Sequence, residues 1–380
     1  MRLNPAIRTN QLPDKSLLSA ILLLILFGWI MSFSASLAHT GSYLNLYKQT
    51  VFIFMGFSAG LILLNTPISV LQKYSIPLFI LTIILLIAVF LPSPIGHKAN
   101  GSYRWINFVF FKFQPSELMK LSMVLFMAGF LIRQEKDIRK PWMGFLKTVL
   151  IIGIADILLI FEADIGATVI ISLTALAMLY AAGSYIKQLS IVVLALFTMI
   201  GAIVMYNPNR LYRIVSFWSE DLWGKADGVH QTQQALIGIA RGDWFGTGLG
   251  AGIQKYSLLP EPQTDMIFST IGEELGVLGM LFVLLSYLYI LLKGFSIAKI
   301  ALQKGRNYSS YVVFGICTWF SMQITVNIGM NLGLLPPKGF TLPLLSYGGT
   351  SIIFAIISLA IILRVDMENR TKYSKQHHYV

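Results

Sequence analysis

The sequence predicts an all-α integral membrane protein that crosses the bilayer many times. Apolar residues make up 56% of the 380 residues, charged residues only 12%, and the mean hydropathy is +0.70. Soluble proteins carry about 25% charged residues. A chain with so few charges cannot cover a water-facing surface, so most of its surface must face lipid. The apolar runs are continuous rather than alternating, which excludes transmembrane strands.

About ten runs have the roughly 20 mostly apolar residues that a transmembrane helix needs. They cover residues 17–38, 46–64, 76–92, 115–132, 143–162, 165–183, 188–206, 266–292, 309–332 and 347–365. The first run could instead be a signal peptide that is cleaved after Ser36-Leu37-Ala38. Its length and the long polar stretch before it favour an uncleaved helix.

The charge distribution predicts the orientation. The chain has 29 Lys and Arg against 17 Asp and Glu, and most of the cations fall on the same side as the N-terminus, so both termini should be cytoplasmic. We expect one membrane domain over 1–380, with cytoplasmic tails at 1–16 and 366–380 and a large extracytoplasmic loop at 207–265. The cations form no single stripe, so no nucleic-acid partner is indicated. The single cysteine excludes a disulfide within the chain.

Four outer segments depart from the pattern of plain apolar helices, at residues 93–114, 114–120, 207–265 and 333–351. The third is a loop of about 60 residues among short connections, and such loops are usually functional. Prolines and glycines prevent a regular helix in the last, which is apolar enough to dip back into the bilayer. Irregular backbone at that depth needs protein or a water-filled cavity around it. We therefore expect the four segments to meet at a polar cavity that opens outward.

Asp265 is the candidate base. It precedes an apolar run, so it could act as a helix N-cap. It could also accept a proton, because partial burial at the membrane edge would raise its pKa toward neutral. The two roles are compatible.

Glu117 and Lys120 are the candidate intramembrane charges. Pro115 should begin a helix, which places them three residues apart on one face. Such a pair can be structural or functional, and Asp156 could also pair with Lys120. Glu273 and Glu274 are adjacent, so they should face different partners.

Four cations of the outer segments are candidates for binding an anion: Arg104, Arg213, Lys255 and Lys338. They could be ordinary solvated charges, or they could together hold an anionic group such as pyrophosphate beside the glycine-rich stretch. That stretch, 246–252, lacks the preceding strand and the Gly-Lys-Ser/Thr ending of a nucleotide loop. The histidines have no ligand-like spacing, so no metal site is assigned.

The motifs resemble those of the SEDS family (shape, elongation, division and sporulation), and the resemblance runs from about residue 20 to 366. The matching segments are Gln114-Pro115-Ser116-Glu117 with Lys120; Asp164-Ile165-Gly166-Ala167-Thr168; Gln234 with the glycine-rich stretch; Leu259-Pro260-Glu261 with Thr264-Asp265-Met266-Ile267-Phe268; Glu273-Glu274-Leu275-Gly276; and Leu342-Pro343-Leu344-Leu345-Ser346-Tyr347-Gly348-Gly349. The run at 337–343 looks more like the division-type branch than the elongation-type branch. Ala163 stands where the family usually has proline.

The resemblance implies an inverting peptidoglycan glycosyltransferase that polymerises lipid II on the outer face of the cytoplasmic membrane and releases undecaprenyl pyrophosphate. It implies that Asp265 is the essential carboxylate, and it adds Gln234 and Ser346 to the substrate-binding candidates Arg104, Glu117, Lys120, Arg213, Lys255 and Lys338. The expected partners are lipid II and undecaprenyl-linked glycan, a class B penicillin-binding protein that acts as transpeptidase, and other membrane proteins of the division machinery at the septum.

One carboxylate and several cations suffice for this chemistry, because the donor already carries a diphosphate leaving group. A divalent cation (Mg or Mn) is plausible, although no residue spacing shows it. Three alternatives remain open: a lipid II flippase, since proline-broken helices and intramembrane charges are transporter-like; an elongation-type polymerase; and a scaffold within the division machinery.

Overall fold

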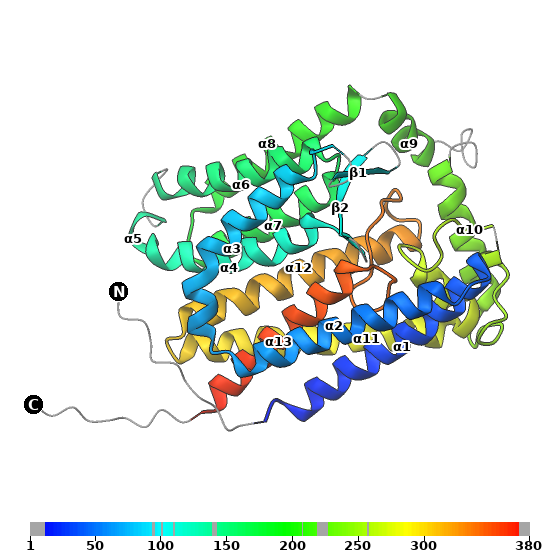
Figure 1. The fold of residues 1–380 in the computed structure, drawn as a ribbon. Helices are drawn as coiled ribbons and strands as arrows, with labels where there is room; N and C mark the ends of the chain where they lie inside the picture. The colour runs from blue at the N-terminus through cyan, green and yellow to red at the C-terminus, as the bar shows by residue number, and fades with distance from the viewer. Residues whose placement is uncertain are drawn as a thin grey trace, which may run out of the picture.

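The computed structural model describes residues 12–92, 96–99, 102–108, 111–138, 143–206, 208–218, 227–256 and 258–371. The long helices run side by side as a bundle, and a small sheet lies near its surface (Figure 1). In chain order the elements are α1 (Lys15–Thr40), α2 (Leu44–Asn65), α3 (Ile68–Ala88), β1 (Gly96–Ala99), β2 (Ser102–Asn107), β3 (Lys112–Phe113), α4 (Pro115–Arg133), α5 (Glu135–Ile138), α6 (Met143–Phe161), α7 (Ile165–Ala181), α8 (Ile186–Met205), α9 (Pro208–Trp218), α10 (Asp227–Gly242), the 3₁₀ turn η2 (Gln254–Tyr256), α11 (Ile267–Gln303), α12 (Asn307–Asn331) and α13 (Thr350–Arg370).

Each of the ten expected apolar runs coincides with a helix. Among the described residues, eight helices are long and apolar enough to cross a membrane, namely α1, α2, α3, α4, α8, α11, α12 and α13, and α7 is a shorter apolar helix. The multi-pass, mainly helical fold is therefore confirmed. The count of ten spans and the sidedness of the termini stay predictions.

The expected helix boundaries differ at three places. α3 begins at Ile68 rather than near 76, because Pro77 is accommodated inside the helix. α11 extends to Gln303 and α13 to Arg370, so polar turns continue both helices beyond their apolar runs. Part of the expected tail at 366–380 is thus helical, whereas residues 1–11 and 372–380 lie outside the described part of the chain.

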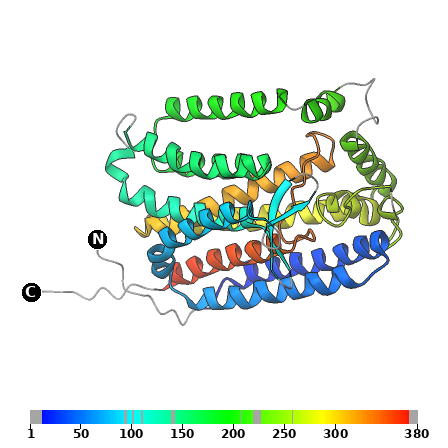
Figure 2. The same ribbon diagram turned by 45° about the horizontal axis from the view of Figure 1, so that its top comes forward.

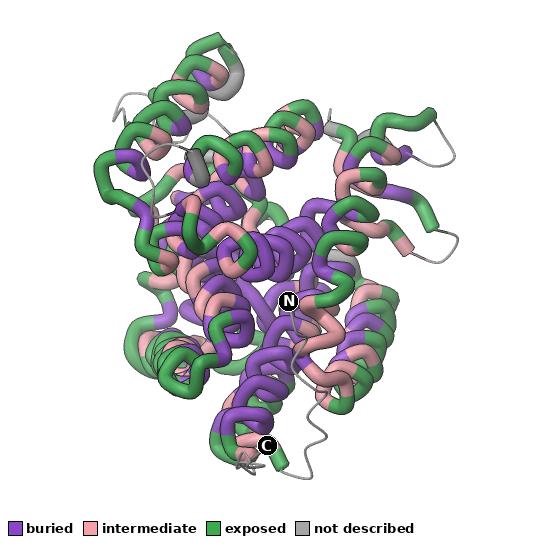
Figure 3. Tube along the Cα trace, turned by 90° about the vertical axis from the view of Figure 1, so that its left-hand side faces the viewer, coloured by how far each residue is buried: buried purple, intermediate pink, exposed green. Residues whose placement is uncertain are grey.

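The centre of the bundle consists of α4, α12 and α13. Nearly every residue of α4 and of α13 is buried, whereas α2, α3 and α8 expose most of their apolar side chains. Figure 3 shows this as a buried interior surrounded by exposed helix faces. α8 packs chiefly against α7 and α9 and lies at the edge of the bundle (Figure 2). The exposed apolar faces fit a lipid environment.

The beginning of α1 and the end of α13 lie at the same end of the bundle. Asp14 caps α1 by accepting hydrogen bonds from the backbone of Ser16 and Leu17. Its carboxylate also pairs with Arg370 of α13, at 2.8 Å. The outer segments gather at the other end, where α10 and the tip of α1 lie together in Figure 1. This arrangement fits termini on one side of the membrane.

The outer segments contain more regular structure than expected. β1, β2 and β3 form an antiparallel sheet in that order, and Gly96 pairs with Ile106 across the first two strands. The segment 207–265 contains the helices α9 and α10 and the turn η2 rather than a plain loop. Its short amphipathic helices carry polar residues and glycines, which resemble a loop composition when read along the sequence.

The connection between α12 and α13 enters the bundle, as expected. Leu342, Leu344 and Leu345 are buried. The Tyr287 hydroxyl of α11 donates a hydrogen bond to the carbonyl of Pro343. On α1, a Cβ at Gly28 would lie 2.6 Å from the carbonyl oxygen of Leu344, so only glycine permits this approach.

We expect Gly28→Ala to destabilise the protein. The added methyl group would press on the backbone of Leu344 and Leu345 at 2.6 Å, and such overpacking costs about 1–3 kcal/mol. The midpoint of thermal unfolding in detergent should fall. The matched control is Gly153→Ala in α6, where no atom lies within 4 Å of the added Cβ. Equal midpoints for the two variants would contradict the close contact.

Candidate active site

The four outer segments meet around one cavity of about 1040 Å³, as the sequence predicts. One wall is aromatic: the rings of Phe52 and Phe111 meet edge to face, with their centroids 6.1 Å apart. The cavity also has cationic and acidic lining groups. It is lined by Lys48, Phe52, Trp105, Asn107, Phe108, Phe111, Lys112, Gln114, Glu117, Lys120, Asp164, Ala167, Ile170, Thr264, Gln323, Gly339, Phe340, Thr341, Tyr347, Gly348, Gly349, Thr350 and Ser351.

Asp265 is not itself a lining residue of the cavity, but it follows Thr264, which lines it. The carboxylate of Asp265 accepts a hydrogen bond from the Thr264 hydroxyl at 3.2 Å, and the residue is 9% exposed. The N-cap interpretation is wrong, because the residue before α11 is Met266 and no side chain caps that helix. The carboxylate is therefore not engaged by the helix start and remains close to the cavity.

Burial raises the pKa of Asp265 to about 7, and the negative charge of Glu261 adds to this effect. The hydrogen bond from Thr264 acts in the opposite direction but is outweighed. A carboxylate whose pKa lies near the working pH can accept a proton from a substrate and release it again. Asp265 has the properties that the sequence analysis requires of the base.

Glu117 and Lys120 form the predicted ion pair in α4 at 2.8 Å, and both line the cavity. Pro115 occupies the first turn of that helix, as expected. Lys120 also donates to the side-chain oxygen of Gln323 in α12. Asp156 does not pair with Lys120. It accepts a hydrogen bond from Ser172 instead.

Asp164 is a cavity residue that begins α7. Its carboxylate accepts hydrogen bonds from the Ala167 backbone at 3.1 Å, the Ser116 hydroxyl at 3.0 Å and the Gln114 amide at 3.4 Å. Arg104 does not line the cavity. Its guanidinium donates to the carbonyl of Ala163, so it stabilises the turn that places Asp164.

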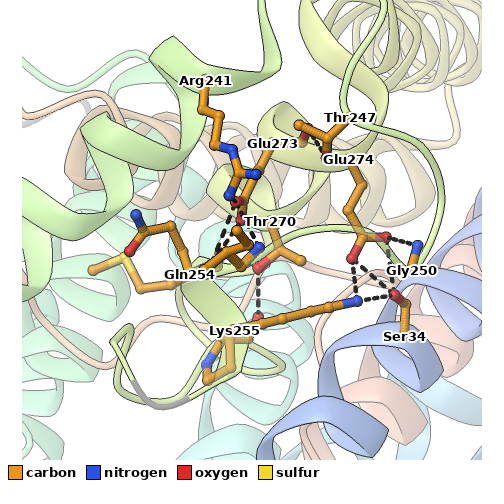
Figure 4. A network of polar contacts seen from close by, with 12 residues as sticks. Ser34, Arg241, Thr247, Gly250, Gln254, Lys255, Thr270, Glu273 and Glu274 are labelled. Carbon is orange, nitrogen blue, oxygen red and sulfur yellow. Dashed lines mark hydrogen bonds and ion pairs between the residues drawn. The ribbon is translucent and has the colours of Figure 1, made fainter.

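Lys255 belongs to a different site. It is 2% exposed and pairs with Glu274, and its ammonium also donates to Ser34 of α1 at 2.8 Å (Figure 4). The neighbouring Glu273 accepts hydrogen bonds from the backbone of residues 253 and 254. The two glutamates thus face different partners, as predicted. Lys255 and Glu274 join the outer segment to α1 and α11, away from the cavity lining.

The glycine-rich stretch packs against a break in α11 and does not line the cavity. At Gly276 the backbone leaves the helical conformation, with φ of 66°. Residues 243–248 supply the hydrogen bonds that the break removes: Thr247 and Gly248 donate to the carbonyls of Glu273 and Glu274, and the carbonyls of Asp243 and Trp244 accept from Val277 and Leu278. These glycines permit close backbone contact rather than hold an anion.

The remaining candidates differ in position. Lys338 is exposed and lies next to Gly339, which lines the cavity. Ser346 closes a turn by accepting a hydrogen bond from the Leu342 backbone at 2.7 Å. Gln234 lies on α10 and is not among the cavity residues. Arg213 belongs to α9, but its side chain lies outside the described residues.

Two cations that line the cavity were not predicted from the sequence: Lys48 of α2 and Lys112 of β3. Both are exposed residues that line it. Nothing near them along the chain separates them from lysines that reach from a helix end or loop into water. The aromatic wall was missed for a similar reason, since aromatic residues are frequent in the whole chain. Only the spatial convergence of α2 with the sheet identifies these groups.

In the described part of the chain, no group of three or more His, Cys, Asp or Glu side chains is placed to hold a metal ion. The two carboxylates that line the cavity are Glu117, which pairs with Lys120, and Asp164, which already accepts three hydrogen bonds. These residues do not form a preassembled metal site.

The fold and site define a polytopic helical membrane protein with a polar cavity beside a buried carboxylate. The chain belongs to the FtsW/RodA/SpoVE family, because the family model, described as cell cycle protein, matches residues 15–371. This confirms the resemblance to the SEDS proteins.

Similar proteins extend over nearly the whole chain. It is 38% identical to a probable peptidoglycan glycosyltransferase FtsW of Legionella pneumophila, over 96% of this chain and 94% of that protein. It is 37% identical to the protein of the same name in Francisella salina, over 94% and 90%.

Solved structures share the fold. One comes from a study titled structural coordination of polymerization and crosslinking by a peptidoglycan synthase complex, with a TM-score of 0.76 and 22% identity over 95% of this chain and 99% of that one. The rod shape determining protein RodA of Thermus thermophilus gives a TM-score of 0.69 at 22% identity, over 95% and 98%. At this identity the likeness concerns the fold alone.

We expect Glu274→Gln to destabilise the protein strongly. The change leaves the ammonium of Lys255, which is 2% exposed, without its counter-charge, and such a loss costs about 3–5 kcal/mol. The midpoint of thermal unfolding in detergent should fall by several degrees. The control is Lys147→Gln, because both partners of the ion pair between Lys147 and Asp137 are solvent-accessible, at 49% and 30%, and the pair should contribute only about 0.2–1 kcal/mol. Equal shifts for both variants would contradict this assignment.

Proposed function

We propose that this protein is a peptidoglycan glycosyltransferase that polymerises lipid II into β-1,4-linked glycan and releases undecaprenyl pyrophosphate. The observation that carries the proposal is the buried carboxylate of Asp265, whose pKa is raised to about 7, beside a cavity with cations and an aromatic wall. Membership of the family and the printed names of the relatives agree with this activity.

The reaction needs a base and a stabilised leaving group. The 4-hydroxyl of the acceptor GlcNAc attacks C1 of the donor MurNAc, and Asp265 takes the hydroxyl proton. The new C–O bond forms as the bond from C1 to the phosphate oxygen breaks, and its electron pair leaves with the diphosphate. Attack from the opposite side inverts the anomeric centre. The donor needs little acid assistance because its leaving group is already activated.

The cavity offers groups for both parts of a lipid-linked sugar. Lys48 and Lys112 are exposed cations on its lining that can contact the diphosphate, and the exposed Lys338 lies beside Gly339. Phe52, Phe108 and Phe111 provide apolar surface for the first isoprene units. These lysines replace Arg104 and Lys255 in the proposed anion site, since Arg104 and Lys255 do not line the cavity. Glu117 and Lys120 form the deep end of the cavity, where they shape it electrostatically.

The biological setting of the reaction is part of the same proposal. The relatives named FtsW support a role in septal wall synthesis, in the cytoplasmic membrane with the cavity facing outward. A class B penicillin-binding protein is the proposed transpeptidase partner, in keeping with the synthase complex that shares the fold. A divalent cation would be held mainly by the substrate diphosphate, because Glu117 and Asp164 already have partners.

We expect Asp265→Asn to abolish polymerisation. The amide cannot accept the hydroxyl proton, and loss of a general base costs about a hundredfold to ten-thousandfold in rate. The measurement is the length and yield of glycan formed from purified lipid II by the full chain, reconstituted with a class B penicillin-binding protein. The variant should keep the native midpoint of thermal unfolding.

The control for that assay is Ser286→Ala on α11, which removes a hydroxyl that bonds to the carbonyl of Phe282 and does not line the cavity, and which should polymerise normally. Native glycan yield from a folded Asp265→Asn protein would refute the proposed base. Movement of fluorescent lipid II across liposomes, with no glycan formed by the native chain, would instead favour the flippase. A scaffold would itself form no glycan and would tolerate neutral substitutions at Asp265 and Lys338.

We expect the rate of polymerisation to rise with pH and to level off above about 7, because Asp265 must be unprotonated to act as base and its pKa is raised to about 7. Glu261→Gln removes a negative charge that raises this pKa. The midpoint of the acid limb should therefore move to lower pH in that variant. An acid limb that stays in place would assign the titration to another group.

A further inference from the structure

α12 carries a stripe of three amide side chains, Gln323, Asn327 and Asn331, which we call the amide stripe. They are four residues apart and therefore lie on one face of the helix. Their exposed fractions are 2%, 0% and 0%. Buried amides inside an apolar helix are costly unless every polar atom finds a partner. The partners of these amides reveal what the stripe does.

At one end of the amide stripe, Gln323 joins the intramembrane ion pair to the α12–α13 connection. The side-chain oxygen of Gln323 accepts hydrogen bonds from Lys120 at 3.1 Å and from the Trp319 indole at 2.7 Å. Its amide nitrogen donates to the carbonyl of Thr341 at 2.7 Å. Since Thr341 lines the cavity, the stripe fixes the cavity wall relative to Lys120.

The other end of the stripe holds the backbone of the candidate base. The amide nitrogens of Asn327 and Asn331 each donate to the carbonyl of Asp265 at 2.9 Å. Asn327 also donates to the carbonyl of Phe340, another cavity residue. Two donors on one carbonyl fix the position of Asp265 along and around the bundle.

Asn331 does more than hold this carbonyl. Its side-chain oxygen accepts a hydrogen bond from the backbone of Ser269 at 3.0 Å. The carbonyl of residue 265 and the N–H of residue 269 are the two groups that would pair if α11 began one residue earlier. The Asn331 amide lies between them and satisfies both. The first helical hydrogen bond of α11 is instead donated by Thr270 to Met266.

We propose that Asn331 and Asn327 are positioning residues that keep Asp265 out of helix α11 and hold its carboxylate beside the cavity. The proposal rests on the proposed function, in which Asp265 is the base. Without the inserted amide, residue 265 can join the helix, and its side chain turns with the backbone. The amide stripe thereby sets the start of α11 at the one residue whose orientation matters for the reaction.

The pKa of Asp265 distinguishes the two possible roles of Asn331. A residue that only stabilised the fold would leave this pKa unchanged. The groups that act on its carboxyl are the charge of Glu261 in its own segment and the uncharged side chains of Gln231 and Thr264. The amides of Asn327 and Asn331 reach its carbonyl only. A change in pKa in an Asn331 variant therefore reports movement of Asp265.

The test replaces Asn331 by leucine, a residue of similar size without the amide, in the full chain. With lipid II as substrate, we expect kcat to fall about tenfold to a hundredfold, since small misplacements of reacting groups cost this much. KM should change less than about threefold. The midpoint of the acid limb should move to lower pH as Asp265 gains access to water.

Two further variants keep the test decisive. Ser321→Ala on the same helix removes a hydroxyl that bonds only within the helix, to the carbonyl of Cys317, and should have native kcat and native pH dependence. Asn331→Ser leaves room for a water between the same two groups. It should retain more activity than Asn331→Leu, and it serves as the test variant if the leucine variant does not fold.

Native kcat and an unmoved acid limb in a folded Asn331 variant would overturn the proposal. So would a loss of activity that only follows the loss of folded protein, with the acid limb in place. Asp265→Asn in the same assay separates the two proposals. If the native chain forms no glycan, the proposed function fails, and if Asp265→Asn polymerises lipid II at the native rate, the assignment of Asp265 as the base fails. If Asp265→Asn is inactive while Asn331→Leu keeps native kcat and pH dependence, only the positioning role fails.

Discussion

The architecture depends on one constraint: a backbone N–H or C=O inside an apolar bundle must find a partner in the protein itself. In the described part of the chain, three irregular backbone regions among the helices are each satisfied by a segment distant in sequence. Residues 243–248 bond to the break at Gly276, the Asn331 amide bonds to the beginning of α11, and Tyr287 donates to Pro343. These bonds fix how the outer segments sit on the helices, and therefore where the cavity lies.

The same constraint separates the buried charges into two groups. Lys255 with Glu274 closes the contact between the outer segment, α1 and α11, and its role is architectural. Lys120 with Glu117 lies on the cavity and is connected through Gln323 to the loop that forms the opposite wall. Asp265 has no cationic partner among these contacts, so burial raises its pKa without a compensating positive charge.

Much of the fold could be predicted from the sequence because it depends on local patterns. Continuous apolar runs locate the helices, and the proline before Glu117 fixes the turn that pairs this residue with Lys120. The convergence of the four outer segments followed from their common side. The roles of the cations could not be predicted. Lys255 and Lys48 look alike in sequence, yet one is buried against Glu274 and the other is exposed on the cavity. Their difference depends on contacts between distant segments, as does the bond from Asn331 to Asp265.

The break in α11 divides this helix into two parts with different surroundings. Residues 267–276 carry Glu273 and Glu274, whose carboxylates contact Arg241, residues 250–255 and Ser34 of α1. The part from 277 to 303 is mainly apolar and is long enough to cross a bilayer by itself. The first part of α11 is therefore shielded by the docking of residues 227–256, whereas the second part can face lipid.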